Sequence, residues 1–401
     1  MVVLAGFLFL NPGPALAAEQ VHLSTLVHRV LGKHPRILAA QSKVKSARAR
    51  EKAADQALYN PDFQLEYEDA SDVTKTLALS QSIDWADKRS ARTHVARLEY
   101  DAAIAQLIVV RQELALELLT ALAGYHSADD LRRIGEQRRD VMQRFLSLSE
   151  QRHRAGDLAQ VALDLARLAS MEARLELARL RGGQAQAEQG LMNVAETRPA
   201  LWPDMPEIPA LTLIQNSNPE ALLEQLPRLR VLQAQVAIAS AAVVQRQSER
   251  RADPTIALRG GRESSDNVIG LSFSIPLFVR NTFSAEVDAA NADAIEMEQR
   301  AKDAHRRSRA RLMSASRRFE LSRTAWQDWM QLGQQSLDSQ VQLLERLWSA
   351  GELSTTDYLV QLKQTLDTRS AAAALRGSLW QAWFEWLSAS GKTEHWLGLK
   401  G

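Results

Sequence analysis

The chain has 401 residues, and its 49 lysines and arginines almost balance its 48 aspartates and glutamates, which leaves a net charge of +1. This balance lacks the basic excess that is typical of nucleic-acid-binding proteins. The chain contains no cysteine, which excludes disulfide bonds, thiolate metal sites and a lipid-modified N-terminal cysteine.

The N-terminal segment has the pattern of a secretory signal. Residues 2–10 are apolar or glycine, and Ala15-Leu16-Ala17 follows with small residues at the two positions that a signal peptidase reads. We predict a signal peptide at 1–17. A membrane anchor is the alternative, but the run is shorter than the roughly 20 residues that a spanning helix needs. Any membrane-inserted part of the chain should therefore consist of strands.

Two long segments without proline predict long helices. Residues 62–198 and 277–401 contain none of the twelve prolines, and a proline inside a helix costs about 3 kcal/mol. Apolar residues also recur there at coiled-coil spacing. We predict nearly continuous helices over 86–154 and 279–349. Each would be about 100 Å long, a length that suits a device spanning a compartment.

The two halves of the chain resemble each other. Pro35-Arg36 corresponds to Pro227-Arg228, and the segment Leu79–Ile83 corresponds to Leu271–Ile275. Further matches keep nearly the same offset, which indicates an internal repeat. The predicted organisation is repeat 1 (18–198), an inter-repeat linker (199–225), repeat 2 (226–391) and a C-terminal tail (392–401).

Each repeat is predicted to contain two strands between its helices. Apolar residues alternate with polar ones, as in Phe63, Leu65 and Tyr67. One chain offers four strands, whereas a barrel without open edges needs at least about eight. Two copies would fill the interior with side chains, and three would leave room for a pore. The predicted strands cover about 62–69, 75–85, 255–262 and 267–278.

These features resemble the TolC-like outer-membrane efflux protein family. The resemblance rests on the tandem repeat, the paired strands, the exit Ile275-Pro276-Leu277-Phe278 and two Ala-Gly-(Asp/Glu)-Leu turns. Within the family the chain looks most like the outer-membrane components of cobalt–zinc–cadmium-type heavy-metal exporters of the RND class. The lipidated branches of the family carry a cysteine after the signal, and this chain has none.

The resemblance implies a mainly α fold with a transmembrane β-barrel. Three chains would form a twelve-stranded barrel in the outer membrane and a coiled-coil helical tunnel in the periplasm of a Gram-negative bacterium. It implies a homotrimer in contact with outer-membrane lipid, a periplasmic adaptor protein and an inner-membrane RND-type pump as partners. It also implies no catalysis and no cofactor.

Two glycine turns are the first candidate sites. Gly156 and Gly351 each interrupt a long helical pattern and are followed by an acidic residue. Glycine supplies the left-handed backbone of a tight helix-to-helix turn. The plain interpretation is a hairpin turn. The resemblance implies in addition that the turns form the periplasmic mouth where the adaptor docks. The implied docking residues are Ala155, Gly156, Asp157, Leu158, Ala350, Gly351, Glu352, Leu353 and Ser354.

A periplasmic gate is the second candidate site. The resemblance places an acidic gate residue at Asp357, whereas the first repeat has Ala162 at the corresponding position and Asp164 two residues later. Arg154, with Arg152 and Arg167, could supply opposite charges. A solvated helix face explains these residues equally well.

Other residue patterns gave weaker signals. Trp380, Trp383 and Trp386 share one helix face, and we expect them to pack against neighbouring helices rather than to form a membrane aromatic belt. No two of the eight histidines lie three to five residues apart, so we expect no metal site within one chain. No phosphate loop, Gly-x-Ser-x-Gly or His-Glu-x-x-His motif is present.

Three functions remain in competition. The first is an efflux duct for heavy-metal cations. The second is the outer-membrane duct of a type I protein-secretion system or of a multidrug exporter, which uses the same fold. The third is a trimeric coiled-coil adhesin, against which the duplicated strand pairs argue. A plain diffusion porin is excluded, because the chain has too few strands and too much helix.

Overall fold

The computed structural model describes residues 14–69, 73–198, 201–215 and 217–399. Its contacts divide the chain into two compact units. The sheet unit comprises 35–110 and 223–308, and the hairpin unit comprises the residues up to 34, 111–222 and 309 onwards. The apolar run of the predicted signal, 2–10, lies outside the described residues. The predicted cleavage point after Ala17 falls in helix α1 (Pro14–Lys33).

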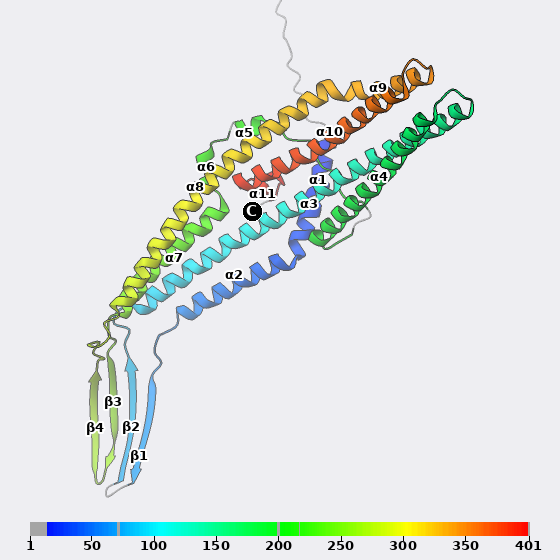
Figure 1. Cartoon of the computed structure of the whole chain (residues 1–401). Helices are drawn as coiled ribbons and strands as arrows, with labels where there is room; N and C mark the ends of the chain where they lie inside the picture. The colour runs from blue at the N-terminus through cyan, green and yellow to red at the C-terminus, as the bar shows by residue number, and fades with distance from the viewer. Residues whose placement is uncertain (1–13, 70–72, 199–200, 216, 400–401) are drawn as a thin grey trace, which may run out of the picture. The chain divides into compact units, whose positions relative to one another are not determined.

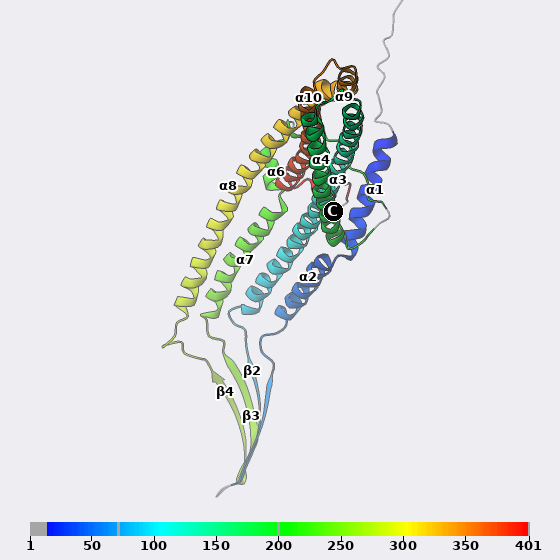
Figure 2. The same ribbon diagram turned by 45° about the vertical axis from the view of Figure 1, so that its right-hand side comes forward.

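The sheet unit joins four helices to four strands. The strands form one antiparallel sheet in the order β1-β2-β3-β4 (Figure 1). A short connection links each strand to one helix that precedes or follows it in the sequence. Figure 2 shows these helices in the same order as their strands. The elements are α2 (Pro35–Ala54), β1 (Asp62–Asp69), β2 (Val73–Ser82), the start of α3 (Lys88–Arg154), α7 (Pro227–Glu249), β3 (Thr255–Glu263), β4 (Asp266–Ser274) and the start of α8 (Ser284–Asp328).

Two strands end earlier than the alternation predicted. Strand β2 stops at Ser82 rather than near residue 85, because the Asp84 carboxylate accepts hydrogen bonds from the backbone N–H groups of Lys88 and Arg89 and so caps α3. Strand β4 stops at Ser274 rather than near 278, because Pro276 has no N–H to donate to a neighbouring strand.

The strand register separates the sheet into two chemically different faces. Phe63 lies opposite Leu79, which lies opposite Leu258, which in turn lies opposite Leu271. Directly paired residues share a face, so large apolar side chains collect on one side. These four side chains are 53–76% exposed. A second row on this face carries Leu65, Leu77 and Ile269, and the opposite face carries Gln64, Ala78, Ala257 and Ser272.

The hairpin unit consists of helices that pair through short turns. Helix α3 has 67 residues, and this confirms the predicted continuous helix. The second long helix was predicted to be nearly continuous over 279–349, and the observed segment is helical to Ser349 but differs in two details. It begins at Ser284 and is interrupted by a π-helical turn, η1 (Trp329–Gly333). The remaining helices of the unit are α4 (Gln160–Ala195), α5 (Thr212–Gln215), α6 (Pro219–Glu224), α9 (Gln334–Ser349), α10 (Thr355–Ser390) and α11 (Thr393–Trp396).

The predicted linker and tail both fold onto the hairpin unit. Trp202 is buried, and the Pro203 carbonyl lies 2.8 Å from Nε2 of His126 on α3. The tail forms α11, whose Trp396 packs against Trp380, Trp383 and Phe384.

The tryptophan stripe lies in the interior of the hairpin unit. Trp380, Trp383 and Trp386 are only 1–4% exposed, and the rings of Trp383 and Trp386 stack 4.9 Å apart. This confirms the expectation of packing and contradicts an aromatic belt. None of the described helices combines the length and apolarity required for a membrane span.

Candidate functional site: the two hairpin tips

The two predicted glycine turns have the same backbone construction. Gly156 has φ +87° between α3 and α4, and Gly351 has φ +80° between α9 and α10. In the first turn Asp157 N–H donates to the Arg152 carbonyl at 2.9 Å, and Gly156 N–H donates to the His153 carbonyl at 3.0 Å. This pair of bonds is the Schellman motif, in which a left-handed residue closes the end of a helix.

The second turn repeats these bonds. Glu352 N–H donates to the Leu347 carbonyl at 2.9 Å, and Gly351 N–H donates to the Trp348 carbonyl at 3.1 Å. A Cβ at either glycine would meet no atom within 4 Å. The backbone angle, and not crowding, therefore requires glycine at both tips.

The helices that leave the two tips begin differently. The Ser354 hydroxyl accepts a hydrogen bond from the Asp357 N–H and lies 2.6 Å from Asp357 Oδ2, which caps α10. Helix α4 follows Ala159, which has no side-chain cap. Of the two helices, α10 is the one with a side-chain N-cap, and the predicted gate residue Asp357 takes part in it. At the first tip the His153 ring nitrogen Nδ1 lies 2.7 Å from the Leu158 carbonyl across the turn.

The two hairpins run side by side near their tips (Figures 1 and 2), and a buried cluster holds them together there. Trp348 of α9 stacks on Tyr358 of α10 with ring centroids 5.1 Å apart, and Phe145 of α3 lies 4.7 Å from Trp348. Arg152 of α3 donates to the Trp348 carbonyl at 3.0 Å and lies over the Trp348 ring. The cluster, which we call the tip core, also contains Met142, Ala166, Ala173, Leu344, Leu362 and Leu366.

The predicted gate residues are not brought together within one chain. Asp164 accepts hydrogen bonds from Gln160 at 2.9 Å and from Arg167 at 3.3 Å, both on α4. Arg154 is exposed at the end of α3. Among the described side chains, no hydrogen bond or ion pair joins Asp357, Asp164 and Arg154 to one another. Arg152, a further possible gate cation, is committed to Trp348 instead.

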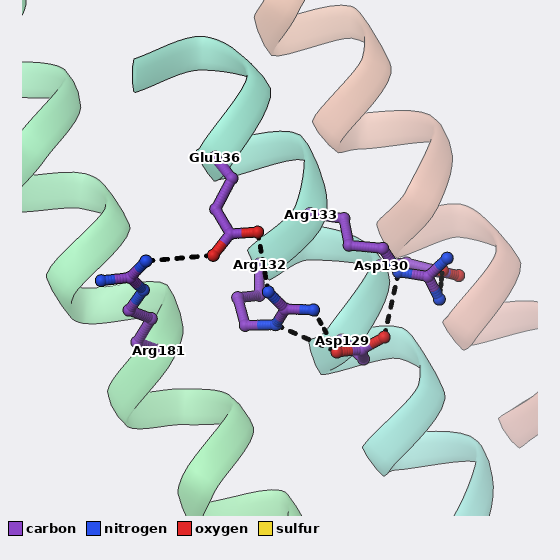
Figure 3. Close-up of polar contacts among 6 residues, drawn as sticks. All are labelled: Asp129, Asp130, Arg132, Arg133, Glu136 and Arg181. Atoms are coloured by element: carbon purple, nitrogen blue, oxygen red, sulfur yellow. Dashed lines mark hydrogen bonds and ion pairs between the residues drawn. The ribbon is translucent and has the colours of Figure 1, made fainter. Parts of the chain in front are cut away.

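An ion-pair network farther along α3 escaped the sequence analysis. Arg132 bonds to both Asp129 and Glu136 at 2.8 Å, and Glu136 continues to Arg181 of α4 at 3.0 Å (Figure 3). The neighbouring Asp130 pairs with Arg133 at 3.1 Å. The i,i+3 and i,i+4 spacing of these charges was a usable signal, but the link to α4 was not visible in the sequence. Within the described part of the chain, no group of three His, Asp or Glu side chains could hold a metal ion.

Tyr358 should make the tip core sensitive to alkaline pH. Burial raises the pKa of its phenol to about 12, with a smaller contribution from Glu345. The folded pKa lies above the unfolded value near 10, so the stabilisation is complete below pH 10 and is lost as the pH rises toward 12. We expect the tips of the wild type to become protease-sensitive over this interval and those of Tyr358→Phe to change less. Equal alkaline sensitivity in both proteins would contradict this.

Comparisons with known proteins agree with this architecture. The outer-membrane channel OprN matches with a TM-score of 0.79 at 16% identity, covering 94% of this chain and 92% of OprN. The channel protein CusC matches with a TM-score of 0.74 at 18% identity, covering 92% of each chain. The fold is therefore that of the TolC-like outer-membrane channels.

The sequence matches point to the same class of protein. Residues 26–195 match the family model described as outer membrane efflux protein. The cobalt-zinc-cadmium resistance protein CzcC of Cupriavidus metallidurans is 24% identical over 390 residues, which is 92% of this chain and 90% of CzcC. These matches confirm the resemblance to the outer-membrane efflux protein family.

Proposed function

We propose that the chain is one protomer of a homotrimeric efflux channel in the outer membrane of a Gram-negative bacterium. The observation that carries the proposal is the sheet: its large apolar side chains are exposed on one face, and β1 and β4 have no further strand beside them among the described residues of one chain. Hydrocarbon does not tolerate open edges. Three copies would supply twelve strands, close the edges and turn the apolar face toward lipid. The native mass of a detergent-extracted sample tests this, and a monomer or dimer contradicts it.

The proposed cargo is heavy-metal cations. Support comes from the likeness to a cobalt-zinc-cadmium resistance protein along nearly the whole chain. The channel would act as a passive conduit, with an inner-membrane RND-type pump and a periplasmic adaptor delivering the cations. Deleting the gene should lower tolerance to zinc, cobalt or cadmium but not to a drug panel. Unchanged metal tolerance with lost drug tolerance or lost protein secretion would favour the alternative ducts.

We further propose that the two tips dock the adaptor. The turn residues Ala155–Asp157 and Ala350–Glu352 are exposed, while the tip core fixes the hairpins behind them. Asp357, Asp164 and Arg154 are proposed to face their gate partners in neighbouring protomers, because one chain does not pair them with each other.

Replacing both tip glycines with valine should abolish export while leaving the trimer in the membrane. A β-branched residue in the left-handed region costs about 1–2 kcal/mol or more at each turn, so the turns must rearrange. Adaptor cross-linking and metal tolerance measure the effect. Gly182→Val is the control, because Gly182 lies inside α4 with nothing within 4 Å of its Cβ position. Normal adaptor binding by Gly156→Val/Gly351→Val would disprove the docking proposal.

A further inference from the structure

The hairpin unit contains a cavity of about 870 Å³ away from the tips. Its walls come from α3, the linker segment 206–208, the end of α8 with η1, and α10. A volume of this size is within the range of small-molecule sites. The cavity has no role in the channel function proposed above.

The cavity carries more positive than negative charge. Four arginines line it, against the carboxylates of Asp130 and Glu207. Asp130 is shared, because it lies 3.1 Å from Arg133 and 3.4 Å from Arg376. The Asp130–Arg133 pair is visible in Figure 3. The other two arginines are Arg323 on α8 and Arg369 on α10.

Arg323 has a side-chain N–H group without a hydrogen-bond acceptor among the described residues. Its side chain is half-buried, and its Nε is enclosed but has no hydrogen-bond partner in the part of the chain that the structure describes. An enclosed donor without a partner is costly. The planar guanidinium fork fits the oxygens of a carboxylate, sulfonate or phosphate group.

An aromatic wall lies beside these charges. Trp326, Trp329 and Met330 line the cavity at the point where α8 enters the π-helical turn. The Trp329 ring packs against Gly333 within the π-helical turn, so that a Cβ at Gly333 would collide with it. Short π-helical segments within long helices are frequent at functional sites.

We propose that this cavity binds an amphipathic organic anion, with its acidic group on Arg323 and its aromatic or apolar body against Trp326 and Trp329. Each half of such a ligand meets a matching surface, because guanidinium groups bind anions and indole rings offer apolar stacking area. A metal cation would be repelled by the arginines. The ligand is therefore distinct from the proposed cargo, and the site does not depend on what the channel exports.

Binding of a model anion tests the proposal. The full chain, assembled in lipid nanodiscs, is titrated calorimetrically with 2-naphthalenesulfonate and with the neutral 2-naphthalenemethanol, and empty nanodiscs supply the background. We expect saturable sulfonate binding, at least tenfold weaker binding of the alcohol, and a tenfold or greater loss of sulfonate affinity in Arg323→Gln. Trp326→Ala should weaken both compounds.

A matched control separates the site from general electrostatics. Arg317 lies on α8 outside the cavity and pairs with Glu320 at 2.6 Å, so Arg317→Gln should bind sulfonate as the wild type does. Equal affinity of the Arg323→Gln and Arg317→Gln proteins would overturn the proposal, as would no binding above the nanodisc background. If Arg323→Gln does not assemble, equal wild-type affinity for the sulfonate and the alcohol would overturn it.

Discussion

Replacing Leu271 with arginine should remove the proposed trimer from the outer membrane. Leu271 is 76% exposed near the middle of β4, on the apolar face of the sheet. An arginine at the midplane of a bilayer costs about 2–4 kcal/mol on the lipid face of a barrel. Three copies would each incur that cost in a trimer, which is comparable to the total stability of an ordinary domain. Membrane fractionation and the native mass measure the loss.

The adjacent residue provides the control for this substitution. Ser272 lies next to Leu271 on the same strand, but its side chain belongs to the opposite, polar face. Ser272→Arg adds the same charge and volume and should leave trimer assembly nearly unchanged. If both arginine variants assemble equally well, the apolar face is not in contact with lipid.

Truncating Trp348 to alanine should loosen the two hairpins behind their tips. Trp348 is 1% exposed and contacts Phe145, Tyr358 and Arg152 from three sides. Removing a large buried aromatic side chain costs about 3–5 kcal/mol. Such a cost increases local opening by about a hundredfold or more. Hydrogen exchange of the amides in α9 and at the start of α10 should rise accordingly, and export should fall because the tips lose their fixed spacing.

Leu343→Ala is the matched variant on the same helix. Leu343 is 47% exposed and lies outside the tip core, so its truncation should change exchange little. The sheet is far in sequence from both positions, and membrane insertion should survive in both variants. Indistinguishable exchange in Trp348→Ala and Leu343→Ala would show that the tip core does not hold the hairpins together.

The sequence was most informative where structure is set by local chemistry. Alternation placed three of the strands, because an exposed sheet with two different faces has period-two polarity. The strand at 255–262 alternates less regularly, and its place in the internal repeat supported it. Within the proline-free segment 62–198, the helix predicted over 86–154 begins two residues before the observed α3. Glycine identified both tips, because only a left-handed residue closes a Schellman motif without strain.

The parts that could not be predicted depend on long-range contacts or on small changes in backbone register. The segment Trp329–Gly333 keeps a helical pattern, so nothing in it separates a π-helical turn from an α-helix. Arg152 and Trp348 are 196 residues apart in the sequence. Local sequence patterns carry no information about a contact over that distance. Asp357 is a different case, because Ser354-x-x-Asp357 has the spacing of a capping box, a signal that the sequence offered and that the gate interpretation did not use.

Because the sheet of one chain has two open edges, the folding of this protein should depend on the concentration of chains. In the described part of one chain, strands β1 and β4 each have an unpaired edge, and such edges favour pairing with any available strand. Completion of the proposed barrel requires three chains to meet, so the yield of channel should fall more steeply than the supply of chains. A cell that makes too few copies would then hold aggregation-prone monomers rather than a proportionate number of channels. Secretion rate, more than the stability of a single chain, would set how much efflux capacity the cell has.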